Sequence, residues 1–132
     1  MQYMLLIHES EDAYSGEDGA KVMEATLAGH MKLIEKLSQS GIAWSGNRLR
    51  EAHTATTLRY ENGGEGIIHD GPFAETHEEL GGYYIVDAPD LDAAIAWARM
   101  IPIPGKGAIE IRPIWSDENE DRDEDEDMGG GQ

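Results

Sequence analysis

The middle of the chain reads Thr-Ala-Thr-Thr-Leu-Arg-Tyr-Glu-Asn-Gly-Gly-Glu-Gly-Ile-Ile-His-Asp from residue 54 to residue 70. Residues 54–60 and 66–70 are short strand-like runs. Between them, Asn62-Gly63 is the strongest short-range hairpin signal, since both positions tolerate a positive φ. The stretch therefore predicts a β-hairpin, and it separates two segments that each combine strands with a helix.

The segment before the hairpin begins with an apolar run, residues 3–8, that predicts a buried strand. Residues 20–40 then predict a helix, because four apolar residues at helical spacing share one face: Met23, Leu27, Ile34 and Leu37. Gly41 follows at the position of a C-terminal cap. Residues 42–45 predict a second strand.

The segment after the hairpin repeats this order. Residues 83–87 predict a strand, and Asp90 can cap a helix that runs to Met100, with Leu91, Ile95 and Ala98 on one stripe. Residues 108–115 alternate as a closing strand. The sequence thus predicts an α+β domain over residues 1–116, ferredoxin-like βαββαβ with an inserted β-hairpin. Gly81-Gly82, before the third strand of this plan, is interpreted as a turn.

An open sheet with two helices on one face leaves its other face bare. Three large aromatic residues can occupy that surface: Trp44, Tyr84 and Trp115. A second copy of the chain is the simplest cover, so we expect a homodimer packed sheet to sheet.

The composition of the chain argues against several classes of function. The chain has 132 residues with a net charge of −17, which argues against direct nucleic-acid binding, because Lys and Arg supply most of the affinity for phosphates. It contains no cysteine, and it has neither a membrane-length apolar run nor a signal-peptide pattern. We therefore expect a cytoplasmic protein. Residues 117–132 are so acidic that we expect a disordered tail.

Asp70 ends the second hairpin strand, immediately before Gly71-Pro72-Phe73. An Asp in such a turn often accepts hydrogen bonds from nearby backbone N–H groups, which would make it structural. A carboxylate fixed at a sheet end can also act as a general base or orient a histidine. The spacing leaves both roles open.

His30 lies between Leu27 and Ile34 on the apolar stripe of the first helix, so it should face the sheet. It is either a core histidine satisfied by backbone or water, or a general base held by a carboxylate. The other four histidines show no ligand spacing, so no metal site is expected. Arg112 can hold a carboxylate ligand or act in a structural ion pair. Tyr83 and Tyr84 point to opposite faces, one to the core and the other to an interface or pocket.

The stretch from Asp70-Gly71-Pro72-Phe73 to Gly81-Gly82-Tyr83-Tyr84-Ile85 resembles the signature of the DGPF subgroup of the YCII-related family. Weaker similarities run over residues 1–115. The resemblance implies a ferredoxin-like domain of the dimeric α+β barrel type. His30 matches the family's proposed catalytic histidine, but Ile101 stands where the family has the paired Asp, which leaves Asp70 as the substitute.

Two functions follow. The first is a dimeric small-ligand-binding or regulatory module with a pocket near His30 and Asp70, and with Arg112, Tyr83 and Phe73 as ligand contacts. The resemblance adds a regulatory partner linked to sigma factors. The alternative is an acid–base enzyme of isomerase or lyase type, with His30 as base and Asp70 orienting it. Neither requires a cofactor.

Overall fold

The computed structural model describes residues 1–74 and 76–116. The predicted acidic tail, residues 117–132, lies outside the described residues. The described chain contains one 3₁₀ turn, η1 (Ala52–Thr54), two α-helices and six strands in this order: β1 (Gln2–Ser10), α1 (Gly19–Ser40), β2 (Trp44–Arg48), β3 (Thr56–Arg59), β4 (Ile67–Asp70), β5 (Glu78–Asp87), α2 (Leu91–Ala98) and β6 (Gly107–Pro113).

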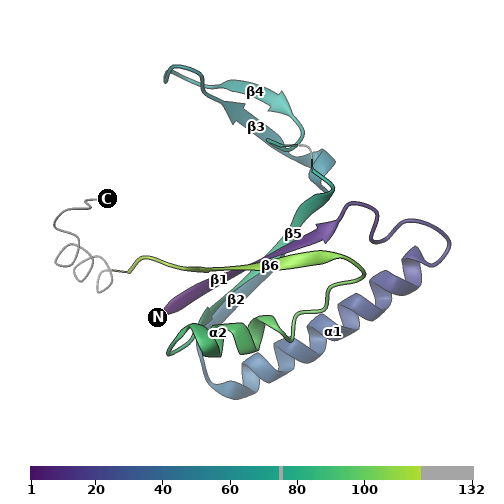
Figure 1. The fold of residues 1–132 in the computed structure, drawn as a ribbon, viewed down its shortest axis with the longest axis vertical. Helices are drawn as coiled ribbons and strands as arrows, with labels where there is room; N and C mark the ends of the chain where they lie inside the picture. The colour runs from purple at the N-terminus through teal and green to yellow at the C-terminus, as the bar shows by residue number, and fades with distance from the viewer. Residues whose placement is uncertain (75, 117–132) are drawn as a thin grey trace.

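Four strands form one antiparallel sheet in the order β2-β5-β1-β6, and β3 pairs with β4 in a separate two-stranded sheet (Figure 1). Without the hairpin, this order places the first and third strands of the domain at the centre and the fourth and second at the edges. That is the ferredoxin-like arrangement, so the predicted α+β fold is confirmed.

Two predicted helix ends are confirmed by their cap geometry. Gly41 ends α1 at a φ of 84°, in the left-handed region where glycine pays no Cβ penalty. Asp90 caps α2, and its carboxylate accepts a hydrogen bond of 2.9 Å from the Ala93 N–H.

The predicted stripe of α1 is confirmed in part. Leu37 is buried and Ile34 packs against the core, but Leu33 is also buried and Leu27 is 40% exposed. The spacing of Leu27 to Met23 and Ile34 suits a core-facing stripe. Leu27 lies instead beside a cavity between α1 and the sheet, and an apolar periodicity cannot distinguish a cavity wall from a packed core.

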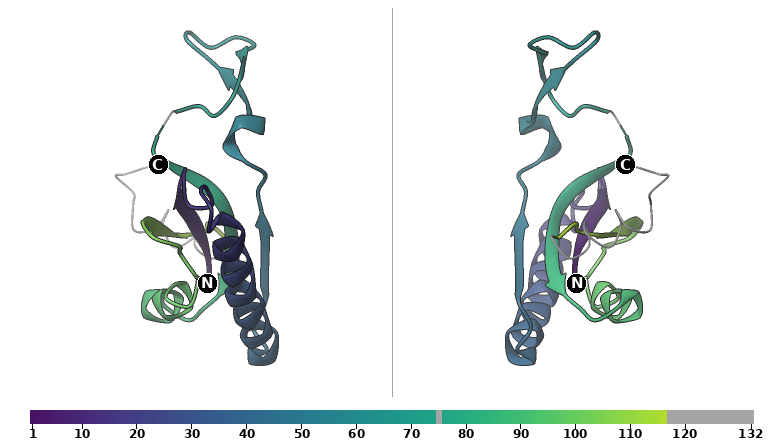
Figure 2. Two further views of the ribbon diagram at one scale, coloured as in Figure 1. Left: turned by 90° about the vertical axis from the view of Figure 1, so that its right-hand side faces the viewer. Right: turned by 90° about the vertical axis from the view of Figure 1, so that its left-hand side faces the viewer.

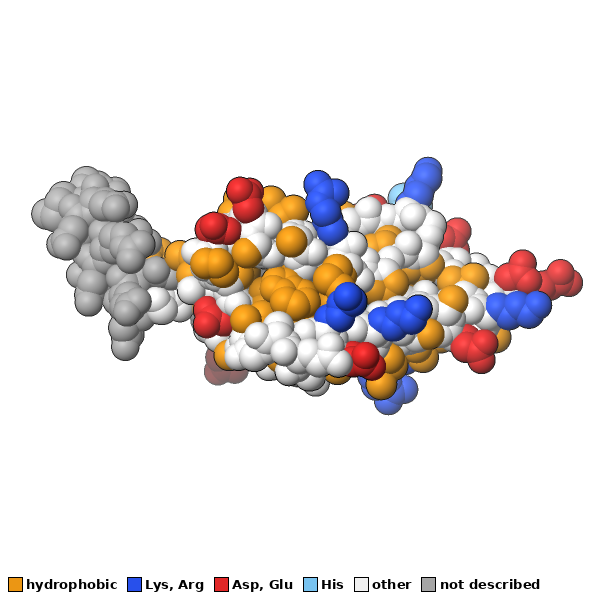
Figure 3. All heavy atoms as spheres, turned by 90° about the horizontal axis from the view of Figure 1, so that it is seen from below, with side chains coloured by type: hydrophobic (Ala, Val, Ile, Leu, Met, Phe, Trp, Pro, Cys, Tyr) orange, Lys and Arg blue, Asp and Glu red, His pale blue; other side chains and the backbone are white. Residues whose placement is uncertain are grey.

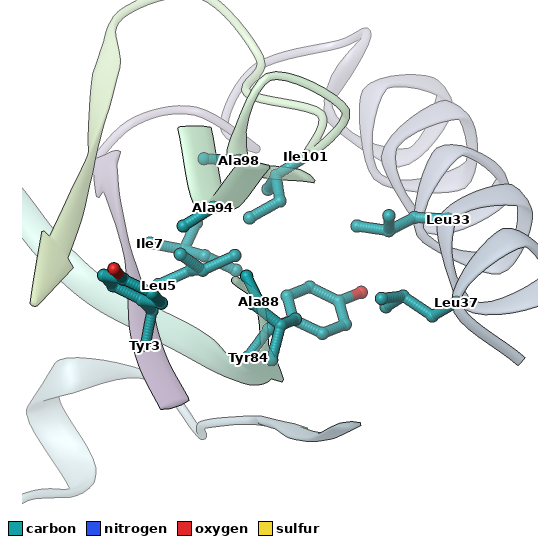
Figure 4. Close-up of a cluster of buried hydrophobic side chains, with 11 residues drawn as sticks. Tyr3, Leu5, Ile7, Leu33, Leu37, Tyr84, Ala88, Ala94, Ala98 and Ile101 are labelled. Carbon is teal, nitrogen blue, oxygen red and sulfur yellow. The ribbon is translucent and has the colours of Figure 1, made fainter. Parts of the chain in front are cut away.

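Both helices cover the same face of the four-stranded sheet (Figure 1). Alternate residues of the two central strands point into the core, among them Leu5 and Ile7 from β1 and Val86 from β5. Figure 4 shows the ring of Tyr84 between the sheet and α1, with its hydroxyl directed toward the helix. The surface seen from below in Figure 3 also carries gathered hydrophobic side chains, with Lys and Arg beside them.

The placement of two aromatic residues on the bare sheet face was wrong. Tyr84 is buried in the core, and Trp44 packs against the same cluster, because their register pairs them with helix-side residues of the neighbouring strands. The side chains that alternate with the core residues occupy the opposite face, which no described element covers: Met4, Leu6, Tyr83 and Ile85.

Gly81-Gly82 does not form the predicted turn. Both glycines lie inside β5, where the register against β1 shifts between Ile7 and His8, so that Gly82 faces Ile7 and Leu80 faces His8. Gly81 is the extra residue of this β-bulge. A Cβ on Gly81 would lie 2.5 Å from Glu9 Oε1, so a larger residue at this position would displace the end of the Glu9 side chain.

The predicted hairpin is confirmed, and it projects from one end of the domain in every view (Figure 2). Its base is closed by hydrogen bonds from the Gly71 N–H to the Ala55 carbonyl, 2.7 Å, and from Thr57 Oγ1 to the Gly71 carbonyl, 2.8 Å. We call residues 55–73 the arm.

Candidate functional site

A cavity of about 400 Å³ opens between α1 and the strands β2 and β5. This size suits a small organic ligand. Its lining is mainly apolar and aromatic and includes Met23, Leu27, Met31, Ile34, Trp44 and Tyr84.

His30 lies in this lining, directed toward the sheet as its position on the helix predicts. Its Nδ1 is 2.7 Å from the hydroxyl oxygen of Tyr84, and the two rings stack with centroids 5.8 Å apart and an interplanar angle of 21°. Gly46 makes this arrangement fit, because a Cβ there would meet the Tyr84 ring at 2.8 Å. The strand β2 therefore leaves the room that the Tyr84 ring occupies.

Burial keeps both partners uncharged near neutral pH. Desolvation lowers the pKa of His30, with Arg48 adding to the effect and Glu9 opposing it. Desolvation raises the pKa of the Tyr84 phenol. A neutral imidazole has one donor and one acceptor nitrogen. With Nδ1 engaged by Tyr84, Nε2 is the nitrogen available to a molecule in the cavity, as a donor or as a base according to the tautomer.

A second polar pair lies in the same lining. The Tyr14 hydroxyl donates a hydrogen bond of 2.5 Å to Glu9 Oε2. Burial first, and then this hydrogen bond and the charge of Glu9, raise the pKa of Tyr14 to about 12. Tyr14 is therefore a constant hydrogen-bond donor, and it engages one oxygen of the Glu9 carboxylate.

The structure does not bring Asp70 to His30 within the chain. Asp70 ends β4 in the arm and is exposed, and it is not part of the cavity lining. No hydrogen bond to its carboxylate is seen in the described residues, so the Asx-turn interpretation finds no support either. The sequence predicts Asp70 as the hydrogen-bond partner of His30. In the structure this partner is the hydroxyl of Tyr84.

The predicted ligand contacts are also separated. Phe73 is 70% exposed at the end of the arm, where the Arg59 guanidinium lies 5.8 Å from its ring centroid. Arg112 pairs with Met4 in the register, which puts it on the uncovered sheet face. Tyr83 borders the cavity, but its hydroxyl accepts a hydrogen bond of 2.9 Å from Asn47 Nδ2 on that uncovered face.

Sequence reasoning missed Tyr84, Arg48 and the Glu9–Tyr14 pair as site residues. Which of the two adjacent tyrosines enters the core depends on which face of the sheet each residue of β5 occupies. The sequence does not reveal this, because residues 83–86 are apolar or aromatic on both faces. One usable signal was Gly46, since a glycine inside a strand often marks the close approach of a neighbour.

Neither a metal centre nor a spanning segment emerges from the described residues. Among residues 1–74 and 76–116, no three His, Cys, Asp or Glu side chains are grouped so that they would hold a metal ion. Within the same ranges, neither helix has the length and apolar character needed to cross a bilayer.

Comparison with known proteins places this geometry in a family. Residues 1–118 match the YCII-related domain. The chain is 37% identical over 119 residues to "Uncharacterized protein R00369" of Rhizobium meliloti (strain 1021), an alignment that covers 86% of this chain and 92% of that protein. The extent of both matches shows that the chain belongs to the YCII-related domain family.

Proposed function

We propose that the chain is a small-ligand-binding module whose ligand occupies the cavity between α1 and the strands β2 and β5. The observation that carries this proposal is the His30–Tyr84 pair, 2.7 Å apart, at an apolar cavity of about 400 Å³. A few polar groups converging in an apolar concavity are typical of ligand sites. Nε2 of His30 supplies the hydrogen bond that orients the ligand.

A fragment screen on the full chain, read by amide chemical shifts in NMR spectra, tests this proposal. Bound fragments are expected to shift residues around His30, Trp44 and Tyr84. Leu27→Trp fills the mouth of the cavity from an exposed helix position and should abolish those shifts. Leu91→Trp, at an exposed position of α2 away from the cavity, is the matched control. Fragment shifts that survive in Leu27→Trp would refute the cavity as the binding site.

We also propose that the module is a homodimer joined through the uncovered sheet face. Its support is the apolar row of Met4, Leu6, Tyr83 and Ile85, half-buried by their neighbours and covered by no other described element. Light scattering at low micromolar concentration should give twice the mass of one chain. Leu6→Glu should yield monomers, whereas Leu91→Glu on the helix side should not. A wild-type monomer would end the dimer proposal.

The His30–Tyr84 hydrogen bond also favours a second candidate, an acid–base enzyme that needs no cofactor. In this reaction the Nε2 of His30 removes a proton next to a carbonyl group, and Tyr84 takes the orienting role first assigned to Asp70.

Deuterium incorporation from heavy water into carbonyl compounds found in the screen measures this activity directly. His30→Ala should abolish incorporation, Tyr84→Phe should alter its pH profile, and Asp70→Asn should leave it unchanged. Undiminished incorporation by His30→Ala would rule out the enzyme.

A further inference from the structure

Arg48 stands at the end of β2, where the apolar cavity joins a second, more polar hollow. Both hollows are lined by the same central group of residues: Glu9, Tyr14, Met23, Arg48 and Gly81. The two hollows therefore adjoin along these side chains. Together we call them the groove, with the His30–Tyr84 pair in its apolar part and Arg48 where the polar part begins.

The guanidinium of Arg48 has spare hydrogen-bonding capacity. Its Nη2 lies 3.3 Å from the sulfur of Met23, which is a weak acceptor. Among the described residues, no carboxylate oxygen lies within 4 Å of it, whereas nearby Arg50 is paired with Glu51 at 3.9 Å. A guanidinium presents five donors in a planar fork that matches a carboxylate.

The apolar part of the groove favours a flat ring. Trp44 and Tyr84 form an aromatic wall with centroids 6.4 Å apart, and His30 stacks on Tyr84. Leu27 and Met31 border the same space from α1. Aromatic rings pack well in such surroundings, edge to face or offset.

Among the described residues, Glu9 is the one carboxylate in the lining of the apolar part, whereas the polar part adds Glu11, Glu51 and Glu79 together with Arg50. One oxygen of Glu9 accepts the Tyr14 hydrogen bond, and the other lies against the backbone of Gly81. Glu9 therefore weakens the attraction for an anion without occupying the donors of Arg48. This arrangement predicts opposite effects from neutralising the two charges.

We infer that the ligand is a small aromatic carboxylate, with its ring against the aromatic wall of Trp44 and Tyr84 and its carboxylate on the guanidinium of Arg48. This inference rests on the proposed ligand-binding function and names the chemical class that the cavity selects. Arg48 supplies charge-assisted hydrogen bonds at the mouth, and the apolar walls exclude water from the ring.

The test titrates the full chain with phenylacetate and with its neutral isostere 2-phenylacetamide, up to about 10 mM, a range that detects millimolar dissociation constants. Binding is read from amide chemical shifts and from the fluorescence of Trp44, corrected with a Trp44→Phe variant. Wild-type protein is expected to bind phenylacetate at least about tenfold more tightly than the amide.

Two charge variants sharpen this result. Arg48→Gln should weaken phenylacetate binding about tenfold and leave amide binding unchanged, since it removes the charged donors alone. Glu9→Gln retains an acceptor for Tyr14 and should strengthen phenylacetate binding about threefold by removing the repulsion. Arg99→Gln, at an exposed arginine at the end of α2 that lines neither hollow, is the matched control and should change neither affinity.

The outcomes separate this inference from the proposed function. If acid and amide bind equally and Leu27→Trp blocks both, the inference that the ligand is a carboxylate is overturned, while the ligand-binding cavity stays in place. The same inference is overturned if phenylacetate fails to bind while other fragments occupy the cavity. If no fragment of any class shifts the cavity residues, the proposed function fails together with the inference.

Discussion

The body of the domain and the arm use the same kinds of apolar side chain in opposite ways. In the body, Leu5 and Val86 are 1% and 0% exposed. In the arm, Leu58 and Ile68 are 51% and 68% exposed, although both lie on paired strands. Strand pairing alone therefore does not bury side chains; the body buries them because two helices cover its sheet.

This difference shows where the chain's stability resides. A two-stranded hairpin is marginally stable on its own in water. The arm is held by its ladder, by the hydrogen bonds of Gly71 and by the contact of Arg59 with Phe73. Its exposed apolar residues add little within one chain, so their substitution should have little effect unless a second molecule covers them.

The largest expected difference is between truncations in the two regions. Leu5→Ala should lower the free energy of unfolding by about 3 kcal/mol, since it removes a fully buried side chain. Ile68→Ala should change it by less than about 0.5 kcal/mol. Urea unfolding followed by circular dichroism measures both. A loss above about 2 kcal/mol for Ile68→Ala, growing with protein concentration, would show that a second copy packs on the arm.

A smaller difference is expected between two glycines. Gly46→Ala should cost about 1 to 3 kcal/mol, because its Cβ would meet the Tyr84 ring at 2.8 Å and the Tyr83 carbonyl at 3.0 Å. Gly63 in the arm has a φ of 80° and open space around it. Gly63→Asn should cost about 0.5 kcal/mol or less, since Asn tolerates this conformation. Equal losses of unfolding free energy in the two variants would mean that Tyr84 is not tightly packed against β2.

The smallest effect concerns pH and isolates His30. Because burial lowers its folded-state pKa below the ordinary value of 6.5, the unfolded chain takes up this proton first as the pH falls. The contribution of neutral His30 to the free energy of unfolding is therefore complete above about pH 6.5 and decreases below it. Unfolding free energies of wild type and His30→Asn, compared from about pH 8 to about pH 5.5, should converge on acidification. Parallel curves would place His30 in water.

Local chemistry made the fold largely predictable. Gly41 and Asp90 act through their own backbone geometry and lie where the sequence places them. The hairpin also forms, but its loop takes a positive φ at Gly63, Gly64 and Gly66 and not at Asn62, so the prediction of a two-residue Asn-Gly turn was wrong. The site was less predictable, because it depends on which face of β5 each residue occupies and on contacts between residues far apart in the sequence. Asp70 and His30 carry suitable chemistry, yet nothing local reveals that the arm carries Asp70 away from the cavity. Tyr84 becomes the partner of His30 only because Gly46 lies opposite it on β2.

The bulge at Gly81 has a consequence for how relatives of this chain diverge. Upstream of it, Leu80 lies opposite His8 and Glu79 opposite Glu9, so the first part of β5 is one residue out of step with the part that carries Tyr84 and Val86. Loss of the Gly81 codon would remove the bulge and leave Leu80 opposite His8 and Glu79 opposite Glu9, so both faces of the sheet would keep their side chains. Within the regular part of the strand, by contrast, a one-residue change in register exchanges the two faces. Relatives can therefore differ in length by one residue at this position while the groove beside Arg48 keeps its composition.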